Sequence, residues 1–206
     1  MQGVLTVISG FSGAGKGTIV KKLVEKYTDY NLSVSMTSRK PREGEREGVD
    51  YFFTDRESFE KAIADGMLIE YNEYNGNYYG TPRKYVEDKL NLGSNVLLEI
   101  EVNGAKNIKR LFPDSVIIFI TPPTADELEM RLRKRGTENE ETIMKRMAIS
   151  AKESAEIANY DYIVVNDDLY KCVEDIRHIT ESAMDQPHRM TEFITGLQNQ
   201  LAKYAQ

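Results

Sequence analysis

The sequence has little of several features that define whole classes of protein. Its 206 residues include one cysteine, Cys172, which excludes an intrachain disulfide and a site of several sulfur ligands. We expect this thiol to be a buried apolar side chain in a reducing compartment. No apolar run approaches the ~20 residues of a membrane-spanning helix, and the first residues lack the basic stretch of a signal peptide. We therefore expect a cytoplasmic protein with no membrane partner.

An excess of positive charge is also missing. The chain has 27 Lys and Arg against 33 Asp and Glu, a net charge of −6, which argues against a surface that lies along nucleic acid. No low-complexity tract is present, and 40% of the residues are hydrophobic, so the whole chain should fold. This length predicts a single domain over residues 1–206 with room for inserted segments.

Short apolar runs and helix-length segments alternate along the chain. The strand candidates are residues 4–9, 96–100, 116–120 and 162–165. An amphipathic stretch, 16–27, follows the first of them with apolar residues at helical spacing. Such alternation predicts an α/β three-layer sandwich, in which helices cover both faces of a central parallel sheet.

Two stretches interrupt this alternation. Residues 34–84 contain short aromatic strand candidates at 51–53 and 68–74, and the Asn-Gly pair at 75–76 is typical of a tight hairpin turn. This stretch predicts an inserted subdomain. Residues 131–146 are strongly charged and predict a mobile lid. The core is then formed by the three remaining ranges, 1–33, 85–130 and 147–206.

Three pairs of residues carry the signals that begin helices. Two pairs have the spacing of a capping box, and the third places a capping hydroxyl before a proline whose φ suits the first helical position. The pairs are Thr54 with Glu57, Thr124 with Glu127, and Thr81 with Pro82.

A glycine-rich turn, GFSGAGKGT, lies between the first predicted strand and the first predicted helix. It matches G-x-x-x-x-G-K in the context that defines a P-loop. The glycines let backbone N–H groups surround phosphate oxygens, and a lysine ammonium reaches the terminal phosphates. We expect it to bind a nucleoside triphosphate through Gly10, Ser12, Gly13, Ala14, Gly15, Lys16, Gly17 and Thr18.

Gly17 stands where many ATPases have a hydroxyl residue that binds Mg²⁺. We therefore expect no direct metal ligand from a side chain, with Mg²⁺ held by phosphates and water, because this ion dehydrates reluctantly. The neighbouring Thr18 is expected to contact phosphate. The Gly-Lys-Gly-Thr ending resembles the P-loop of adenylate kinases and points to the nucleoside monophosphate kinases as a group.

A kinase of this group needs a second anion site, and the inserted segment offers one. Arg39 and Arg42 flank a Lys-Pro pair, and two guanidinium groups held close together suit a phosphate dianion. Tyr51 and Tyr79 can add phenolic donors. On the arginines alone, a solvated charged loop is an equally good interpretation.

Motifs along most of the chain resemble those of guanylate kinases. They are S-x-T-S-R-x-P-R at 35–42, G-x-D-Y-x-F at 48–53, E-Y-x₆-Y-Y-G-T at 70–81, L-E-I-E-V-N-G-A at 98–105, P-P-T at 122–124, R-L-R-K-R-G-T-E at 131–138 and Y-D-Y-I-V-V-N-D at 160–167. The resemblance implies transfer of the γ-phosphoryl group of ATP to GMP or dGMP, giving ADP and GDP, in purine nucleotide metabolism, with Mg²⁺ as cofactor. It implies ATP and GMP as the small-molecule partners.

The resemblance also places a GMP site in the inserted subdomain. The GMP phosphate would be bound by Arg39, Arg42, Tyr51 and Tyr79, and the guanine would be read by Ser35, Glu70 and Thr81. A carboxylate such as Glu70 can accept from N1–H and N2–H₂ of guanine, whereas N1 of adenine carries no proton. Rejection of AMP should then be strong, because the buried carboxylate would be left unpaired. Ser35 and Thr81 also have a simpler interpretation, as a strand hydroxyl and a helix cap.

Two carboxylates lie on the predicted strand, taken here as 96–101. Glu99 and Glu101 would share a face because strand side chains alternate, and they would lie beside the P-loop at the carboxyl end of the sheet. We expect them to contact GMP or the water around Mg²⁺. Guanylate kinases usually have aspartate where this chain has Glu101, so this position departs from the family.

Three arginines resemble those of the family's lid. Arg131, Arg135 and Arg146 would close over the triphosphate and, with Lys16 and Arg39, stabilise charge on the transferring group. No general base is required, because the attacking phosphate is already anionic. Closure of both inserted segments would exclude water, with a hinge near residues 34 and 84.

Asn166 is a further candidate site residue. By resemblance, Asn166 orients the P-loop or the lid, although a simple turn-forming residue is an alternative.

Residues 190–204 carry Phe193, Ile194, Leu197 and Leu201 at helical spacing. This spacing predicts an amphipathic helix that docks on its own core or on another subunit, so a homo-oligomer is possible.

Two other functions stay open at this point. One is a kinase for another small phosphate on the same scaffold, which the set Ser35, Glu70 and Thr81 disfavours. The other is a guanylate kinase-like module that binds proteins without catalysis, which Lys16 and the lid arginines disfavour. The lack of an Asn-Lys-x-Asp sequence disfavours a GTPase switch.

Overall fold

The computed structural model describes residues 3–74, 76–134 and 139–205, and its centre is a sheet of five parallel strands. Their spatial order is β2-β7-β1-β8-β9. The bounds are β1 Leu5–Gly10, β2 Tyr30–Leu32, β7 Asn95–Glu99, β8 Val116–Thr121 and β9 Tyr162–Val165. Because β1 lies in the middle, the glycine-rich turn after it lies at the centre of the sheet's carboxyl edge, where ligands bind in such folds.

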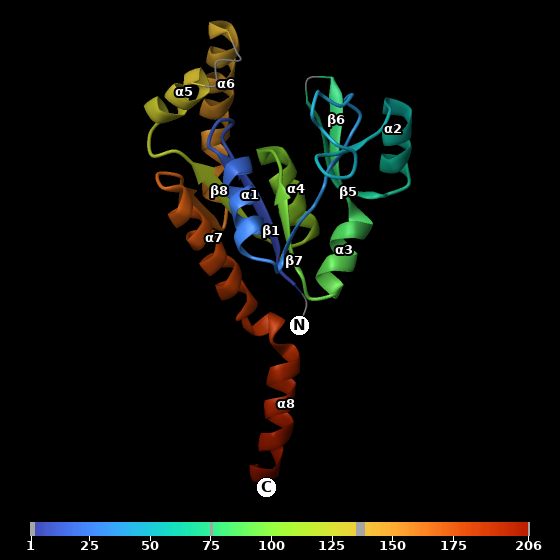
Figure 1. Cartoon of the computed structure of the whole chain (residues 1–206). Helices are drawn as coiled ribbons and strands as arrows, with labels where there is room; N and C mark the ends of the chain where they lie inside the picture. The colour runs from blue at the N-terminus through green and yellow to red at the C-terminus, as the bar shows by residue number, and fades with distance from the viewer. Residues whose placement is uncertain (1–2, 75, 135–138, 206) are drawn as a thin grey trace.

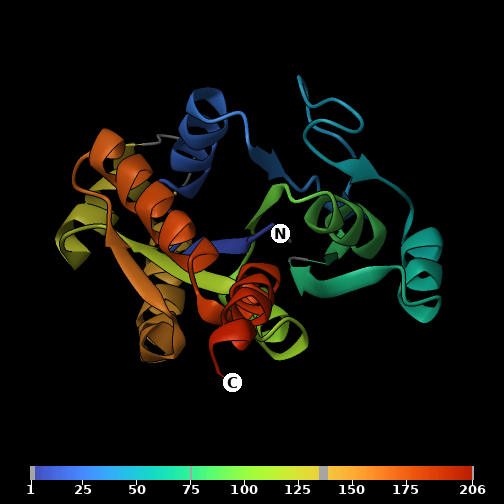
Figure 2. The ribbon, with the colours of Figure 1, turned by 90° about the horizontal axis from the view of Figure 1, so that it is seen from below.

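Helices cover both faces of this sheet (Figures 1 and 2). α1 (Lys16–Lys26) and α7 (Leu169–Met184) pack on one face, and α3 (Arg83–Asn91) and α4 (Val102–Leu111) on the other. β1 contributes to both cores, because Ile8 faces the first pair of helices and Val7 the second. This arrangement confirms the predicted three-layer sandwich. Strand β2 was missed by sequence reasoning because it is only three residues long.

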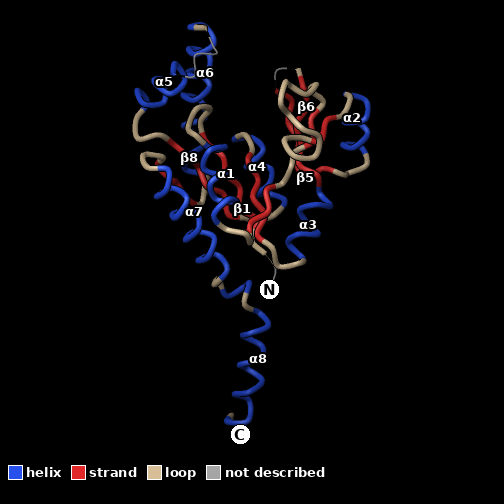
Figure 3. The backbone as a smooth tube through the Cα atoms, viewed as in Figure 1, coloured by secondary structure: helices blue, strands red, loops and turns tan. Residues whose placement is uncertain are grey.

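A second sheet lies within the predicted inserted segment, in the order β4-β3-β6-β5 (Figure 3). The bounds are β3 Met36–Thr37, β4 Phe52–Phe53, β5 Leu68–Tyr74 and β6 Asn77–Pro82. β5 and β6 pair antiparallel as the hairpin pattern predicted, and Asn75 of its turn lies outside the described residues. α2 (Arg56–Ala64) packs on this sheet through the fully buried Phe59. The two-residue strand β3 was not predicted.

The remaining helices lie toward the C-terminus. They are α5 Ala125–Lys134, α6 Glu140–Glu153, α8 Thr191–Leu201 and the 3₁₀ turns η1 Ser154–Asn159, η2 Pro187–Arg189 and η3 Ala202–Tyr204. The predicted lid limits, 131 and 146, fall inside α5 and α6, so the lid stays a prediction. Figure 1 shows α8 running away from the rest of the chain, and none of its residues is buried. The predicted tail helix is confirmed, but it does not dock on its own core.

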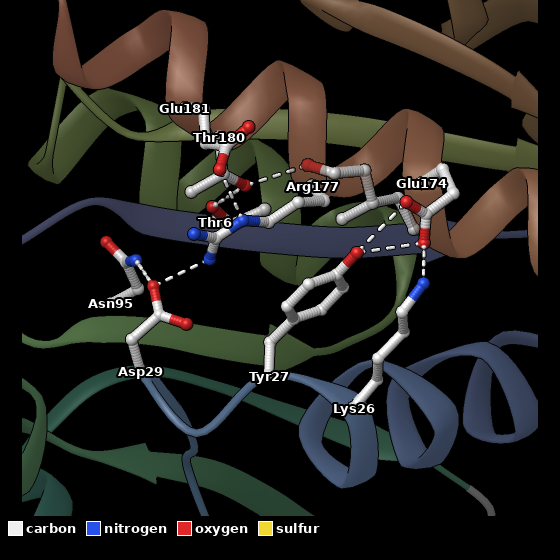
Figure 4. A network of polar contacts seen from close by, with 10 residues as sticks. Thr6, Lys26, Tyr27, Asp29, Asn95, Glu174, Arg177, Thr180 and Glu181 are labelled. Carbon is white, nitrogen blue, oxygen red and sulfur yellow. Dashed lines mark hydrogen bonds and ion pairs between the residues drawn. The ribbon is translucent and has the colours of Figure 1, made fainter.

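A polar network ties α7 to α1 and the sheet (Figure 4). Arg177 of α7 donates to Asp29 at 2.6 Å, and Asp29 also accepts from Asn95 at 3.0 Å. The Tyr27 hydroxyl donates to Glu174 at 2.9 Å, and the Arg177 guanidinium lies 4.8 Å from the centre of the Tyr27 ring. Cys172 of α7 is buried, as expected. No helix of the described ranges is both long enough and apolar enough to cross a membrane.

Two of the three predicted helix starts need correction. α2 is capped by Asp55, whose side chain accepts from Ser58 N at 2.7 Å, because Thr54 is held back by a backbone bond to β3. Thr81 belongs to β6 and caps no helix, because its hydroxyl donates to Glu70 instead. Thr124 does accept from Glu127 N at 3.1 Å at the start of α5.

Candidate nucleotide site

The glycine-rich turn has the backbone of an anion-binding loop. Gly10, Gly13 and Gly15 have φ of 139°, 97° and 92°, values that favour glycine. A Cβ at Gly10 would lie 2.1 Å from Ile120 O, and one at Gly15 would lie 2.5 Å from the amide nitrogen of Asn166. Lys16 begins α1, and its ammonium donates to Gly10 O at 2.7 Å and Phe11 O at 3.1 Å. The P-loop geometry is therefore present at the N-terminus of α1.

Two residues far along the chain contact this turn, and a third contacts one of them. Arg146 of α6 donates to Ser12 Oγ at 2.9 Å, and Asn166 donates to Ala14 O at 2.7 Å. Arg131 of α5 donates to Asn166 O at 2.8 Å. Asn166 thus connects the P-loop to Arg131, and its role in orienting the loop stays a prediction. Arg135, the third predicted lid arginine, lies outside the described residues.

A cavity of about 380 Å³ extends from the P-loop to the second sheet. Donor-side and acceptor-side residues share its walls, which sequence reasoning alone did not establish. Of the predicted site residues it is lined by Lys16, Ser35, Arg39, Arg42, Tyr51, Glu70, Tyr79, Glu99 and Glu101. It is also lined by residues that were not assigned to the site, including Glu45, Asp50, Asn72 and Gly104.

The two predicted phosphate-binding arginines are organised by Glu45. Arg39 donates to the Glu45 carboxylate at 3.0 and 2.8 Å, and the Arg42 backbone N–H donates to it at 2.8 Å. The Arg39 guanidinium also lies 5.4 Å from the centre of the Tyr51 ring. Hydrogen bonds from Arg39 and Arg42 lower the pKa of Glu45, so it is ionised. The loop is therefore ordered around these arginines, which disfavours the solvated-loop interpretation.

Glu70 is the buried carboxylate of the cavity. It is 8% exposed, and its Oε1 accepts from the Thr81 hydroxyl at 2.7 Å. Burial raises its pKa, and the bonds from Thr81 oppose that rise. Its other oxygen faces α4, where a Cβ at Gly104 would come within 2.9 Å. Gly104 lies in the motif at 98–105. The sequence alone does not show that the absence of a side chain at Gly104 makes room for the Glu70 carboxylate.

Glu99 and Glu101 lie at the junction of β7 and α4. β7 ends at Glu99, and Glu101 is the N-cap residue of α4, so the prediction that both lie on one strand was wrong. Both still line the cavity. Desolvation by the surrounding protein raises the pKa of Glu99, although its side chain is exposed to the open cavity. A Cβ at Gly17 would lie 3.5 Å from this carboxylate, so Gly17 keeps the space beside Glu99 open.

A further carboxylate, Glu153, was missed by sequence reasoning. It ends α6, one of its oxygens is buried, and that oxygen has no partner among the described residues. Burial and the nearby Glu101 raise its pKa to about 7, and Lys16 opposes this rise. Burial likewise raises the pKa of the neighbouring Tyr160 to about 12. No sequence signal separates Glu153 from the other charged residues of α6.

The carboxylates of this site fit an Mg²⁺ ion that is bound mainly by phosphate oxygens and water. Among the described residues no group of three or more His, Cys, Asp or Glu could hold a metal ion. Mg²⁺ keeps several waters and is commonly bound by one or two carboxylates together with substrate phosphates. Glu99, next to Gly17, is placed to accept hydrogen bonds from such waters.

Comparison with known proteins gives a consistent result. The family model of guanylate kinase matches residues 2–183. A guanylate kinase of Listeria innocua is 47% identical over 202 residues, 96% of this chain and 98% of that protein. One from Latilactobacillus sakei is 50% identical over 182 residues, 88% of this chain and 90% of that protein.

A solved structure agrees with these sequence relatives. The crystal structure of guanylate kinase from Anaplasma phagocytophilum superposes with a TM-score of 0.76 at 35% identity. The superposition covers 91% of this chain and 89% of that one. The chain belongs to the guanylate kinase family.

Proposed function

We propose that this chain transfers the γ-phosphoryl group of ATP to the phosphate of GMP or dGMP, giving ADP and the diphosphate. One observation carries the proposal: a single cavity is lined by Lys16 of the P-loop, by Arg39 of the loop after β3 and by Glu70 of β5. A triphosphate on the P-loop and a monophosphate at Arg39 would meet in that cavity. Membership of the guanylate kinase family supports the same reaction.

The acceptor side is suited to a guanine nucleotide. Arg39, Arg42, Tyr51 and Tyr79 line one part of the cavity and supply donors for a phosphate dianion. Glu70 lies in another part with Oε1 bound by Thr81, so the carboxylate is fixed to accept from guanine N1–H and N2–H₂. Ser35 lines the cavity as well. Adenine has no N–H donor at N1 or C2, so the buried carboxylate would keep only its bond from Thr81, which penalises AMP.

The transfer step needs positive charge at fixed positions. Lys16, Arg39, Arg131 and Arg146 supply it, and Asn166 keeps Arg131 registered with the P-loop. We assign the same role to Arg135 by its place in the motif. The GMP phosphate is the nucleophile and is already anionic, so no side chain has to remove a proton.

We expect Mg²⁺ to be the remaining source of positive charge at the phosphates. When bound, it would neutralise charge on the β- and γ-phosphates of ATP. Residue 17 has no side chain to bind it, so this chain would hold it through phosphates and through water contacting Glu99 or Glu101. Titration of Mg²⁺ into the protein with a non-hydrolysable ATP analogue, followed by calorimetry, tests this without turnover: Glu99→Gln should weaken binding only when the nucleotide is present.

Closure over the substrates would exclude water. In Figure 1, β5, β6 and α2 rise on one side of α1, and α5 and α6 rise on the other. Their approach would bring Arg131 and Arg146 toward the phosphates and protect ATP from hydrolysis. We place the reaction in the cytoplasm, where both substrates and a reduced Cys172 are found together.

The test is ADP formation from Mg²⁺-ATP with GMP, dGMP, AMP, CMP or UMP as acceptor. Turnover restricted to GMP and dGMP, and lost in Lys16→Met, is the expected result. Binding of GMP without turnover would contradict the proposal and favour a protein-binding module. Turnover with a different phosphate would favour another kinase on this scaffold.

A further inference from the structure

The face of the second sheet that carries Glu70 bears one more polar side chain, Asn72. The two residues lie two apart in β5, so their side chains point to the same side of the strand. In the pairing of β5 with β6, Glu70 lies opposite Thr81 and Asn72 lies opposite Tyr79. Directly opposed residues of an antiparallel pair share a face as well. Of these four residues, Glu70, Asn72 and Tyr79 line the cavity.

The Asn72 amide makes no hydrogen bond in the part of the chain that the structure describes. On the same face, Glu70 is already bound by the Thr81 hydroxyl at 2.7 Å. The Asn72 side chain is half-buried and carries two amide donors and one carbonyl acceptor. An amide that is partly withdrawn from water and unpaired gains from a ligand that supplies a partner. Asn72 is therefore available to a molecule that occupies the cavity.

Glu70 and Asn72 lie at different ends of the proposed acceptor site. Glu70 lies at the end proposed for the guanine. Tyr79 lies at the end proposed for the phosphate, because its ring centre is 6.0 Å from that of Tyr51, which in turn lies 5.4 Å from the Arg39 guanidinium. Residues two apart in a strand are separated by about 6.8 Å. Asn72, opposite Tyr79, is displaced from Glu70 by that distance toward the phosphate end.

The chemistry of a guanine nucleotide indicates which atom Asn72 meets. With N1–H and N2–H₂ on Glu70, the opposite part of the purine presents N7 and C8. In the common anti conformation of a nucleotide, the 5′-phosphate lies on the C8 side of the base, so N7 is the ring acceptor nearest the phosphate. O6 is also an acceptor, but it adjoins N1 and lies toward Glu70. An amide donor at position 72 therefore complements N7.

We propose that Nδ2 of Asn72 donates a hydrogen bond to N7 of the bound guanine, which makes Asn72 a second specificity-determining residue of the acceptor site. The inference rests on the proposed function, because it takes GMP or dGMP as the acceptor. Glu70 separates guanine from adenine, whereas the contact to N7 separates purines from pyrimidines, which have no N7. The two contacts lie on different edges of the base, so together they stop it from rotating about the Glu70 carboxylate.

Charge makes an amide the suitable group at position 72. N7 carries a lone pair, and the phosphate dianion proposed to bind at Arg39 lies near it. A carboxylate of the same shape would face both with negative charge and would offer no donor. We therefore expect Asn72→Asp to weaken GMP binding at least 20-fold, and Asn72→Ala to weaken it about fivefold.

The probe for this contact is 7-deaza-GMP, in which a C–H group replaces N7 and the Watson–Crick edge, sugar and phosphate are unchanged. For the unaltered protein, KM for 7-deaza-GMP should be about tenfold higher than KM for GMP, because the amide donor loses its acceptor. In Asn72→Ala the two KM values should lie within about twofold of each other, because no donor is left to lose. Steady-state kinetics at saturating Mg²⁺-ATP measures all four values.

Tyr71→Phe is the matched control. Tyr71 neighbours Asn72 in β5, points to the other face of the strand and is 46% exposed. This variant should keep the KM ratio of the unaltered protein. Far-ultraviolet circular dichroism should be unchanged in every variant, because neither Tyr71 nor Asn72 belongs to a buried hydrophobic cluster of the described residues.

Calorimetry of GMP and 7-deaza-GMP binding without ATP separates this inference from the proposed function, since it does not depend on turnover. The dissociation constants should differ about tenfold in the unaltered protein and about equally little as the KM values in Asn72→Ala. If this difference holds although neither nucleotide is phosphorylated, the proposed function fails and the Asn72 contact stands.

Two results would overturn the inference. One is equal affinity of the unaltered protein for both nucleotides; if Asn72→Ala then weakened both alike, the amide would contact the phosphate and not the base. The other is a difference between the nucleotides that persists undiminished in Asn72→Ala, which would show that another group contacts N7.

Discussion

The carboxylate of Glu45 holds the guanidinium of Arg39 through hydrogen bonds of 3.0 and 2.8 Å and accepts a third from the backbone N–H of Arg42. Arg39 also donates to Lys40 O at 2.7 Å. These bonds fix the direction in which Arg39 presents its remaining N–H groups. Glu45 is therefore a positioning residue for the proposed phosphate site.

Removal of this carboxylate should weaken GMP binding selectively. In Glu45→Ala the guanidinium loses a charge-assisted pair that is only partly exposed, and Arg39 regains rotamer freedom. We expect KM for GMP to rise about tenfold, which corresponds to about 1.4 kcal/mol, with KM for ATP within twofold. Steady-state kinetics with each substrate varied in turn measures both.

The matched control is Glu43→Ala, an exposed carboxylate in the same loop. It should leave both KM values within twofold. An equal effect of the two substitutions would show that only the charge of the loop matters.

The Thr81 hydroxyl should make GMP binding less sensitive to acid. Burial raises the pKa of Glu70 and the bond from Thr81 lowers it, so Thr81→Val should raise that pKa further. Protonated Glu70 cannot accept from both guanine donors, so KM for GMP should rise as pH falls. In Thr81→Val this rise should begin at higher pH. Profiles of KM for GMP between pH 5 and 8 test this; two superimposable profiles would contradict it.

Gly104 should be needed for the position of Glu70. A Cβ there would lie 2.9 Å from Glu70 Oε2, so the carboxylate would have to shift, and 3.2 Å from Ile100 Cδ1, which is a tight contact. In Gly104→Ala we expect Glu70 to shift and KM for GMP to rise at least tenfold. Asn103→Ala, at the exposed neighbouring position, is the control. An unchanged KM for GMP in Gly104→Ala would contradict this, because it would show that Glu70 and Ile100 accommodate the added methyl group without loss of GMP binding.

Glu153 should make the fold less stable as pH rises. Its pKa is raised from 4.5 to about 7 in the folded chain, so the folded state binds the proton more tightly than the unfolded state. Stability is therefore lost as pH rises from about 4.5 through 7. Glu153→Gln should gain about 1 kcal/mol more at pH 8 than at pH 5, after allowance for partial solvent exposure. Urea unfolding at both pH values measures this, and equal gains would contradict it.

Sequence reasoning succeeded where a residue's role depends on its neighbours in the chain. The P-loop glycines, β5, β9 and the tail helix follow from local spacing, and the structure confirms them. The family motifs predicted both an ATP site at the P-loop and a GMP site in the inserted segment.

It failed where the role depends on contacts distant in sequence. Thr81 looked like a helix cap, but burial beside Glu70 gave its hydroxyl a stronger partner. Glu153 looked like any charged residue of α6 until the fold placed it near Glu101 and Lys16. Gly104 has an ordinary helical sequence context, and its importance comes from a carboxylate on another element.

The most direct test of the guanine site is the selectivity of Glu70→Gln. The ratio of kcat/KM for GMP to that for AMP should fall at least 100-fold, about 2.7 kcal/mol, because the amide has one acceptor and turns a donor toward guanine. Glu73→Gln, an exposed position on the same strand β5, should keep the ratio of the unaltered protein. If Glu70→Gln keeps its preference for GMP within threefold, Glu70 does not read the base and the account of this cavity is wrong.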